Sequence, residues 1–224
     1  MPSTGGTPLG LGTTAVNYSQ NISSLTASTT YHFCAIAQNS LGTSYGSVLS
    51  FTTTAVTSTY TIQPGPEGKD TYYGTVYTTG GCPDCADLYI GGWGDWYYDF
   101  LEFDLTSSPT AAQTVKAELW VYGSAPNNPA IQINRITASW TEAGVTSASN
   151  PASSFYANMS AVPSTANWVV TDITSLYQGW KNGTYINYGV KLVPTLNNQT
   201  NGSIASSDNA TAANRPKLVV TYVP

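Results

Sequence analysis

Apolar and polar residues alternate in short runs along most of the chain, and clusters of Pro, Gly and Asn separate these runs. An alternation with a period of two is typical of a β-strand that buries one face. The clearest runs lie at residues 100–105, 115–122, 131–136, 168–170, 189–193 and 218–223. The sequence therefore predicts an all-β protein whose strands are joined by turns.

One segment departs from this strand pattern. Its apolar residues recur at i, i+3, i+4 and i+7, which is the spacing of one helix face: Ile173, Leu176, Tyr177 and Trp180. Asp172 precedes them as an N-cap and Gly183 follows them as a helix end. Many strands and one short capped helix favour a jelly-roll β-sandwich for this part of the chain.

The low fraction of charged residues and the net negative charge exclude some classes of binding partner. Only 8% of the 224 residues are charged, whereas soluble globular proteins average roughly 25%. A net charge of −5 provides no basic face for phosphates, which argues against nucleic-acid binding. No run of about eighteen apolar residues is present to span a membrane. A surface of hydroxyl and amide side chains is common in secreted β-proteins, so we expect an extracellular or cell-surface location.

Residues 1–54 read as short strands and carry a local resemblance to the C-terminal part of a fibronectin type III domain. Tyr31 stands in a tyrosine-corner pattern. The matching segments are Ile22-Ser23-Ser24-Leu25, Thr30-Tyr31-His32-Phe33, Ala37-Gln38-Asn39-Ser40-Leu41-Gly42 and Phe51-Thr52-Thr53. Such a sandwich needs about 90–100 residues, so the early strands are absent and the sheet is truncated. The resemblance therefore implies open strand edges that a neighbouring domain or another chain must cover.

Residues 1–6 contain no signal segment in which basic residues precede an apolar run, so either a signal was removed or the chain is a fragment of a larger surface protein. The truncation of the fibronectin-like unit favours the fragment. The interpretation divides the chain into a partial fibronectin-like unit at 1–54, a Thr- and Ser-rich linker at 55–60 and a jelly-roll module at 61–224.

The order of motifs in the third part carries a second resemblance. The matching segments are Phe100-Leu101-Glu102-Phe103-Asp104-Leu105, Ala117-Glu118-Leu119-Trp120-Val121-Tyr122, Trp140-Thr141-Glu142, Val170-Thr171-Asp172-Ile173-Thr174, Trp180, Asn187-Tyr188-Gly189, Ser206-Ser207-Asp208 and Arg215-Pro216-Lys217-Leu218-Val219-Val220-Thr221-Tyr222. Together they resemble the disaggregatase-related, DNRLRE type of module, which is similar to a family of uronate-polysaccharide-binding modules. This resemblance implies a jelly roll that is appended to surface proteins and polysaccharide lyases and has no catalysis of its own.

The pair Cys82 and Cys85 forms a C-x-x-C motif. No His follows it, which excludes covalent haem attachment, and no second pair is present for a four-cysteine zinc site. A thioredoxin-like redox role would need a βαβ context that the sequence lacks. We therefore expect a small disulfide that orders a loop in an oxidising compartment.

Acidic residues gather between residues 70 and 104. Loop carboxylates are the hard oxygen ligands that calcium prefers, so a structural calcium ion is the candidate cofactor, although solvated loop charges are the simpler reading. The candidate ligands are Asp70, Asp84, Asp87, Asp95 and Asp99. Glu102 and Asp104 share one strand face, and neither they nor the single His32 suggests an acid pair or a catalytic triad. No other cofactor is predicted.

The segment 91–100 combines aromatic residues with Gly and Asp. Flat aromatic faces next to polar groups suit the stacking of sugars, and the glycines expose the neighbouring rings. The candidate ligand-binding residues are Trp93, Asp95, Trp96 and Tyr97. A sandwich core with a packed loop is the alternative for this segment.

Two functional hypotheses follow. The first is a non-enzymatic carbohydrate-binding or adhesion module of a surface or secreted protein, with a polysaccharide or glycan as its partner. The second is a structural subunit of an extracellular assembly or filament, packed on copies of itself or on neighbouring domains through strand edges.

Overall fold

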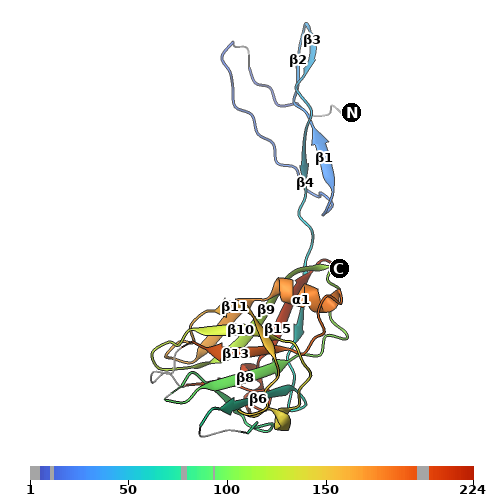
Figure 1. The fold of residues 1–224 in the computed structure, drawn as a ribbon. Helices are drawn as coiled ribbons and strands as arrows, with labels where there is room; N and C mark the ends of the chain where they lie inside the picture. The colour runs from blue at the N-terminus through green and yellow to red at the C-terminus, as the bar shows by residue number, and fades with distance from the viewer. Residues whose placement is uncertain (1–5, 11–12, 77–79, 93, 196–201) are drawn as a thin grey trace. The chain divides into compact units, whose positions relative to one another are not determined.

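The computed structural model describes residues 6–10, 13–76, 80–92, 94–195 and 202–224 (Figure 1). The chain divides into two compact units, Met1–Val56 and Thr57–Pro224, which are described separately. The described residues contain fifteen β-strands and one α-helix, and every strand pairing is antiparallel. The prediction of an all-β fold with one short helix is confirmed.

The first unit consists of two antiparallel strand pairs. β1 (Thr30–Phe33) pairs with β4 (Leu49–Thr52), and β2 (Ile36–Asn39) pairs with β3 (Gly42–Tyr45). The Tyr31 ring stacks on Phe51, with 5.8 Å between the ring centroids, and the Tyr31 hydroxyl accepts a hydrogen bond from the backbone N–H of Thr26. None of the described residues of this unit is buried, so its apolar side chains have no core of their own.

The second unit is a β-sandwich of two sheets. Sheet I has the strand order β11-β10-β13-β8-β6 and sheet II has the order β5-β15-β9-β14-β7, with β12 beside β9. The strands of sheet I are β6 (Lys69–Gly74), β8 (Tyr97–Glu102), β10 (Ile131–Ile136), β11 (Ser153–Met159) and β13 (Val190–Pro194). The strands of sheet II are β5 (Ser58–Ile62), β7 (Asp87–Ile90), β9 (Thr114–Ser124), β12 (Asn167–Asp172), β14 (Gly202–Ala205) and β15 (Lys217–Tyr222).

The core follows from the alternation in the strands. Along β9, Ala117, Leu119 and Val121 are buried between the sheets, whereas Trp120 and Tyr122 point the other way and are half-exposed. The same period in the strands of both sheets contributes Leu88, Leu101, Ile131, Ile133, Leu192, Ile204, Leu218 and Val220 to the core. Burial of each of these aliphatic side chains stabilises the folded state by about 1.5–3 kcal/mol relative to its exposure to water.

Helix α1 (Thr174–Lys181) packs on this core through Leu176, Tyr177 and Trp180. The Tyr177 hydroxyl donates to the carbonyl of Pro109 over 2.6 Å. The predicted cap is shifted by one residue: Ile173 occupies the N-cap, and the Asp172 carboxylate accepts from the N–H of Thr174 instead. Short 3-10 helices lie at Glu142–Gly144 and Ala212–Asn214. No described helix is long and apolar enough to cross a membrane.

Two glycines in the left-handed region provide a test of the packing between β8 and β13. At Gly189 (φ +80°) a Cβ would lie 2.1 Å from the carbonyl oxygen of Leu101, whereas at Gly183 (φ +79°) no atom lies within 4 Å. Gly189→Ala is therefore expected to lower the free energy of unfolding by roughly 2–5 kcal/mol, from backbone strain plus overpacking. Gly183→Ala, which adds backbone strain alone, should cost about 1–2 kcal/mol. Denaturant midpoints that fell equally in both variants would contradict this account.

Candidate functional site

The aromatic segment that the sequence singled out is only partly open to solvent. Trp93 lies outside the described residues. Trp96 is half-buried, and Tyr97 begins β8 with its ring against Tyr72 and Tyr89, at centroid distances of 6.3 and 5.6 Å. Tyr97 is thus a packing residue as well as a candidate ligand.

Asp95 has an organising role in this segment. Its side chain is fully buried, and Oδ1 accepts hydrogen bonds from the backbone N–H groups of Thr75, Val76 and Trp96 at 2.6, 2.8 and 2.8 Å. A carboxylate that accepts several N–H groups satisfies donors that would otherwise be lost to the interior. Asp95 therefore ties the loop that precedes β8 to the end of β6.

The five predicted calcium ligands do not form one cluster. Asp87 is exposed and accepts a hydrogen bond from the side chain of Asn209, and Asp84 is exposed in the cysteine loop. Asp95 is engaged as described above, whereas Asp70 and Asp99 are buried neighbours on β6 and β8. The described residues contain no group of three or more His, Cys, Asp or Glu side chains placed to hold a metal ion. Of the five candidate ligands, the fold brings Asp70 and Asp99 together and leaves the other three apart from one another.

Burial is the largest influence on the pKa values of Asp70 and Asp99. It raises the pKa of Asp70 to about 6, and burial together with the nearby Asp70 charge raises the pKa of Asp99 well above its usual range. The hydrogen bond from the backbone N–H of Ser207 acts in the opposite direction on the pKa of Asp70. Two buried carboxyl groups without a basic partner are an unusual feature of a protein interior.

The predicted disulfide joins Cys82 and Cys85, whose Cα atoms are 5.5 Å apart. The backbone N–H of Cys82 donates to the hydroxyl of Thr71 on β6 over 2.7 Å. The disulfide loop is thereby attached to the strand that carries Asp70.

The outer face of sheet II carries an aromatic platform that sequence reasoning missed, formed by Trp120, Tyr122, Trp168 and Lys217. Trp120 lies opposite Lys217 on β15, and Tyr122 lies opposite Trp168 on β12. The Trp168 ring is 5.9 Å from Trp120 and 5.4 Å from Tyr122, and Lys217 Nζ is 4.2 Å from the Trp168 centroid and 5.0 Å from that of Trp120. All four side chains are half-buried.

The platform could have been predicted from the sequence, because the alternation of residues 119–122 shows which side chains face away from the core. Residues 120 and 122 alternate with the buried Leu119 and Val121, so their rings must lie on the face opposite to the core. Large aromatic side chains at two successive outward positions of a central strand indicate a contact surface.

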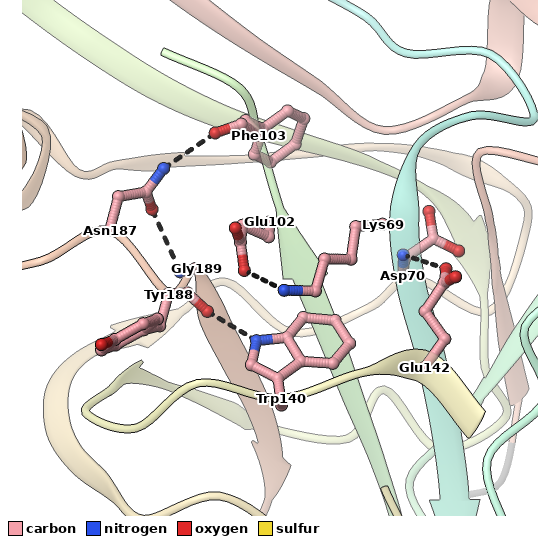
Figure 2. Close-up of polar contacts among 9 residues, drawn as sticks. All are labelled: Lys69, Asp70, Glu102, Phe103, Trp140, Glu142, Asn187, Tyr188 and Gly189. Atoms are coloured by element: carbon pink, nitrogen blue, oxygen red, sulfur yellow. Dashed lines mark hydrogen bonds and ion pairs between the residues drawn. The ribbon is translucent and has the colours of Figure 1, made fainter. Parts of the chain in front are cut away.

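A polar groove of about 790 Å³ runs between β5 and the segment that follows β8. Figure 2 shows the contacts beside it: Lys69 Nζ forms an ion pair with Glu102 at 2.7 Å and lies 4.4 Å from the Trp140 ring centroid. The Trp140 N–H donates to the carbonyl of Tyr188, and the Asn187 amide donates to the carbonyl of Phe103. Since these groups already bind one another, they stabilise the wall of the groove and are not free for a ligand.

The family comparison agrees with this architecture. The sequence profile of carbohydrate-binding module family 96 matches residues 91–222, which is more than half of the chain and contains the whole aromatic platform. No curated protein sequence matches the chain.

The organising role of Asp95 is testable by comparison with Asp104, an exposed aspartate whose Oδ1 accepts from the N–H of Thr106. Asp95→Ala should lower the free energy of unfolding by roughly 2–4 kcal/mol, because buried backbone donors lose a charged acceptor. Asp104→Ala should cost about 1 kcal/mol or less, because water replaces the lost acceptor. Urea titrations followed by tryptophan fluorescence measure both. If Asp95→Ala left the free energy of unfolding unchanged, the Asp95 carboxylate would again be a candidate ligand group.

Proposed function

The chain belongs to carbohydrate-binding module family 96, and from this we propose that it binds a polysaccharide through the aromatic platform of sheet II. The observation that carries the proposal is the pairing of two indoles and one phenol on adjacent strands of an open sheet face. The C–H faces of a pyranose pack on such rings, while its hydroxyl groups remain available to water and polar side chains.

The charge on the platform favours an acidic sugar. Lys217 places its ammonium group over the Trp168 and Trp120 rings, and cations over indoles are attracted by the ring quadrupole. A uronate bound beside the rings would offer its carboxylate to this ammonium group in an ion pair with hydrogen bonds. The resemblance to uronate-binding modules supports the same class of ligand.

The aromatic segment around Trp96 and Tyr97 is the second candidate surface for a glycan. It retains the half-exposed Trp96, with Trp93 outside the described residues, but its carboxylate Asp95 is engaged internally. The platform offers three rings and the ammonium group of Lys217 within one sheet face, which is why we place the main site there.

We further propose that the module is non-catalytic and extracellular. The only His of the chain, His32, lies exposed in the first unit, and the acidic residues of the second unit are buried, paired or dispersed. The Cys82–Cys85 disulfide and the low charge content suit an oxidising compartment.

The first unit supports a role in attachment. Its two strand pairs with exposed Phe33, Leu41 and Phe51 fit a partial fibronectin type III-like sheet that is completed by other strands. Strand addition from a neighbouring domain or from another copy would cover these edges. The structural-subunit hypothesis therefore rests on this unit, and the binding hypothesis rests on the other.

The binding proposal is tested with Trp120→Ala and Trp168→Ala against alginate, polygalacturonate and a neutral β-glucan. Each indole is worth on the order of 1 kcal/mol, so each variant should bind about fivefold more weakly, with a larger loss in the double variant. Lys217→Met should weaken binding to the two uronates only. Isothermal titration or affinity electrophoresis gives the constants, and the same incubations should release no new reducing ends.

Two controls locate the site. Phe155→Ala removes an exposed aromatic ring from sheet I and should leave affinity unchanged. Trp96→Ala tests the second surface. Unchanged affinity in both platform variants, with a loss in Trp96→Ala, would move the site to the segment predicted from sequence, and no affinity for any of the three polymers would favour the structural hypothesis.

The state of the first unit is tested by hydrogen exchange in the intact chain. Because no described residue there is buried, amides of β1 to β4 should exchange within minutes in dilute protein, while those of β9 remain protected far longer. Protection that rises with protein concentration would support strand addition between copies. Strong protection of β1 to β4 at low concentration would instead show an independently stable domain.

A further inference from the structure

A pair of aspartates lies on the inner face of sheet I, between the two sheets. Asp70 on β6 and Asp99 on β8 are 4% and 0% exposed. In the β6–β8 register Asp99 is opposite Tyr72, so Asp70, two residues earlier, is its diagonal neighbour on the same face. Two acidic side chains therefore project into the core side of an edge region of the sandwich.

Most of the oxygen atoms of this pair have no protein partner. Asp70 Oδ2 accepts from the backbone N–H of Ser207 at 2.8 Å, but Asp70 Oδ1 and both oxygens of Asp99 lack a hydrogen bond among the described residues. Buried polar groups are hydrogen-bonded in the large majority of proteins, and buried charges are paired or bind metals. Three orphaned carboxylate oxygens in one place point to a missing ligand.

The basic groups nearest to this region have other partners. Lys69 pairs with Glu102, and Arg215 donates through Nε to the carbonyl of Asn209. Lys191 has its ammonium group over the rings of Tyr98, Tyr73 and Phe100, on the opposite face of sheet I. Within the described part of the chain, no cation is thus placed to neutralise the two aspartates.

Further acidic groups around Asp70 add negative charge to this region. Glu142 accepts a hydrogen bond from the backbone N–H of Asp70 (Figure 2). Asp208 and Glu142 both raise the pKa of Asp70 through their charge, and Asp84 acts in the same way on Glu142 and Asp208. A field of this sign attracts a cation and disfavours an empty pair of carboxylates.

We propose that Asp70 and Asp99, with the neighbouring Ser207, bind one calcium ion between the two sheets. The donors are all oxygens, and the cysteines near them are joined in a disulfide, so soft or borderline metals such as zinc are disfavoured. Calcium tolerates irregular sets of carboxylate, hydroxyl and carbonyl ligands, whereas magnesium demands octahedral geometry and retains its water. The two carboxylates supply charge, and neutral oxygens complete the shell.

Such an ion would join the two sheets of the sandwich. Ser207 follows β14 of sheet II, whereas Asp70 and Asp99 belong to sheet I. The calcium ion is therefore expected to stabilise the second unit without contact with the aromatic platform. Calcium binding is measured by thermal unfolding, whereas glycan binding is measured by affinity.

The test is thermal unfolding of the intact chain followed by tryptophan fluorescence, since all six tryptophans lie in the second unit. Protein stripped with EGTA is compared with protein in calcium chloride at neutral pH. Calcium at about a hundred times its dissociation constant should raise the midpoint by roughly 5–10 °C. Titration calorimetry should give one ion per chain.

The variant Asp99→Asn should change the unfolding midpoint in different ways without and with calcium. Without calcium it should unfold at a higher temperature than the wild type, because a neutral amide replaces a buried carboxyl group that is costly to ionise beside Asp70, but calcium should no longer raise its midpoint. Asp104→Asn, the same change at an exposed site, should keep the full calcium response.

Three outcomes would overturn the proposal. The first is a wild-type midpoint that calcium leaves unchanged, which would identify the pair as two carboxyl groups that share protons. The second is an Asp99→Asn variant that still responds, and the third is an equal rise with magnesium chloride. Loss of glycan binding in the platform variants leaves the calcium response untouched, so the two proposals fail independently.

Discussion

The two-residue period of β9 is the constraint on which the rest of the second unit depends. β9 pairs with β15, β12 and β14, so its register fixes the faces of three other strands. Leu119 and Val121 fill the core because they point inward, and Trp120 and Tyr122 meet their partners because they point outward. A slip by one residue would exchange these faces and bury the platform. The core and the candidate binding surface are thus two consequences of one pairing.

Much of this fold is readable from the sequence, and the failures have local causes. The run at 131–136 coincides with β10, because apolar residues recur along it at positions 131, 133 and 136 and turn residues bound it. β11 was not predicted: its sequence SSFYANM has little apolar content for an edge strand of sheet I. A carboxylate beside aromatic rings predicts a polar partner for sugar hydroxyls at Asp95, but this carboxylate accepts hydrogen bonds from backbone donors that are distant in sequence. Such a partner can be seen only after folding.

The motifs that carried the resemblance mainly stabilise the framework. Trp140, Glu142 and Asn187 bind the backbone of Tyr188, Asp70 and Phe103 respectively, and they hold loops against sheet I (Figure 2). Side chains that satisfy backbone groups of distant segments are costly to replace, since each loss leaves a buried donor or acceptor unpaired. The outward-facing side chains of the aromatic platform do not have this structural role. The same set of motifs also contains Trp120, Tyr122 and Lys217, so the resemblance covers part of the aromatic platform as well as the framework.

The disulfide loop and segments from both sheets meet at one corner of the sandwich. β6 and β7 are edge strands of sheets I and II, and an edge exposes backbone groups and loosens packing. The N–H of Cys82 binds Thr71 on β6, and the N–H of Ser206 binds the carbonyl of Ala86 just before β7. The adjacent Ser207 then reaches Asp70, so the disulfide loop, the segment after β14 and the aspartate pair meet there. A cation at this point would neutralise the acids and join the segment after β14 to strands β6 and β8.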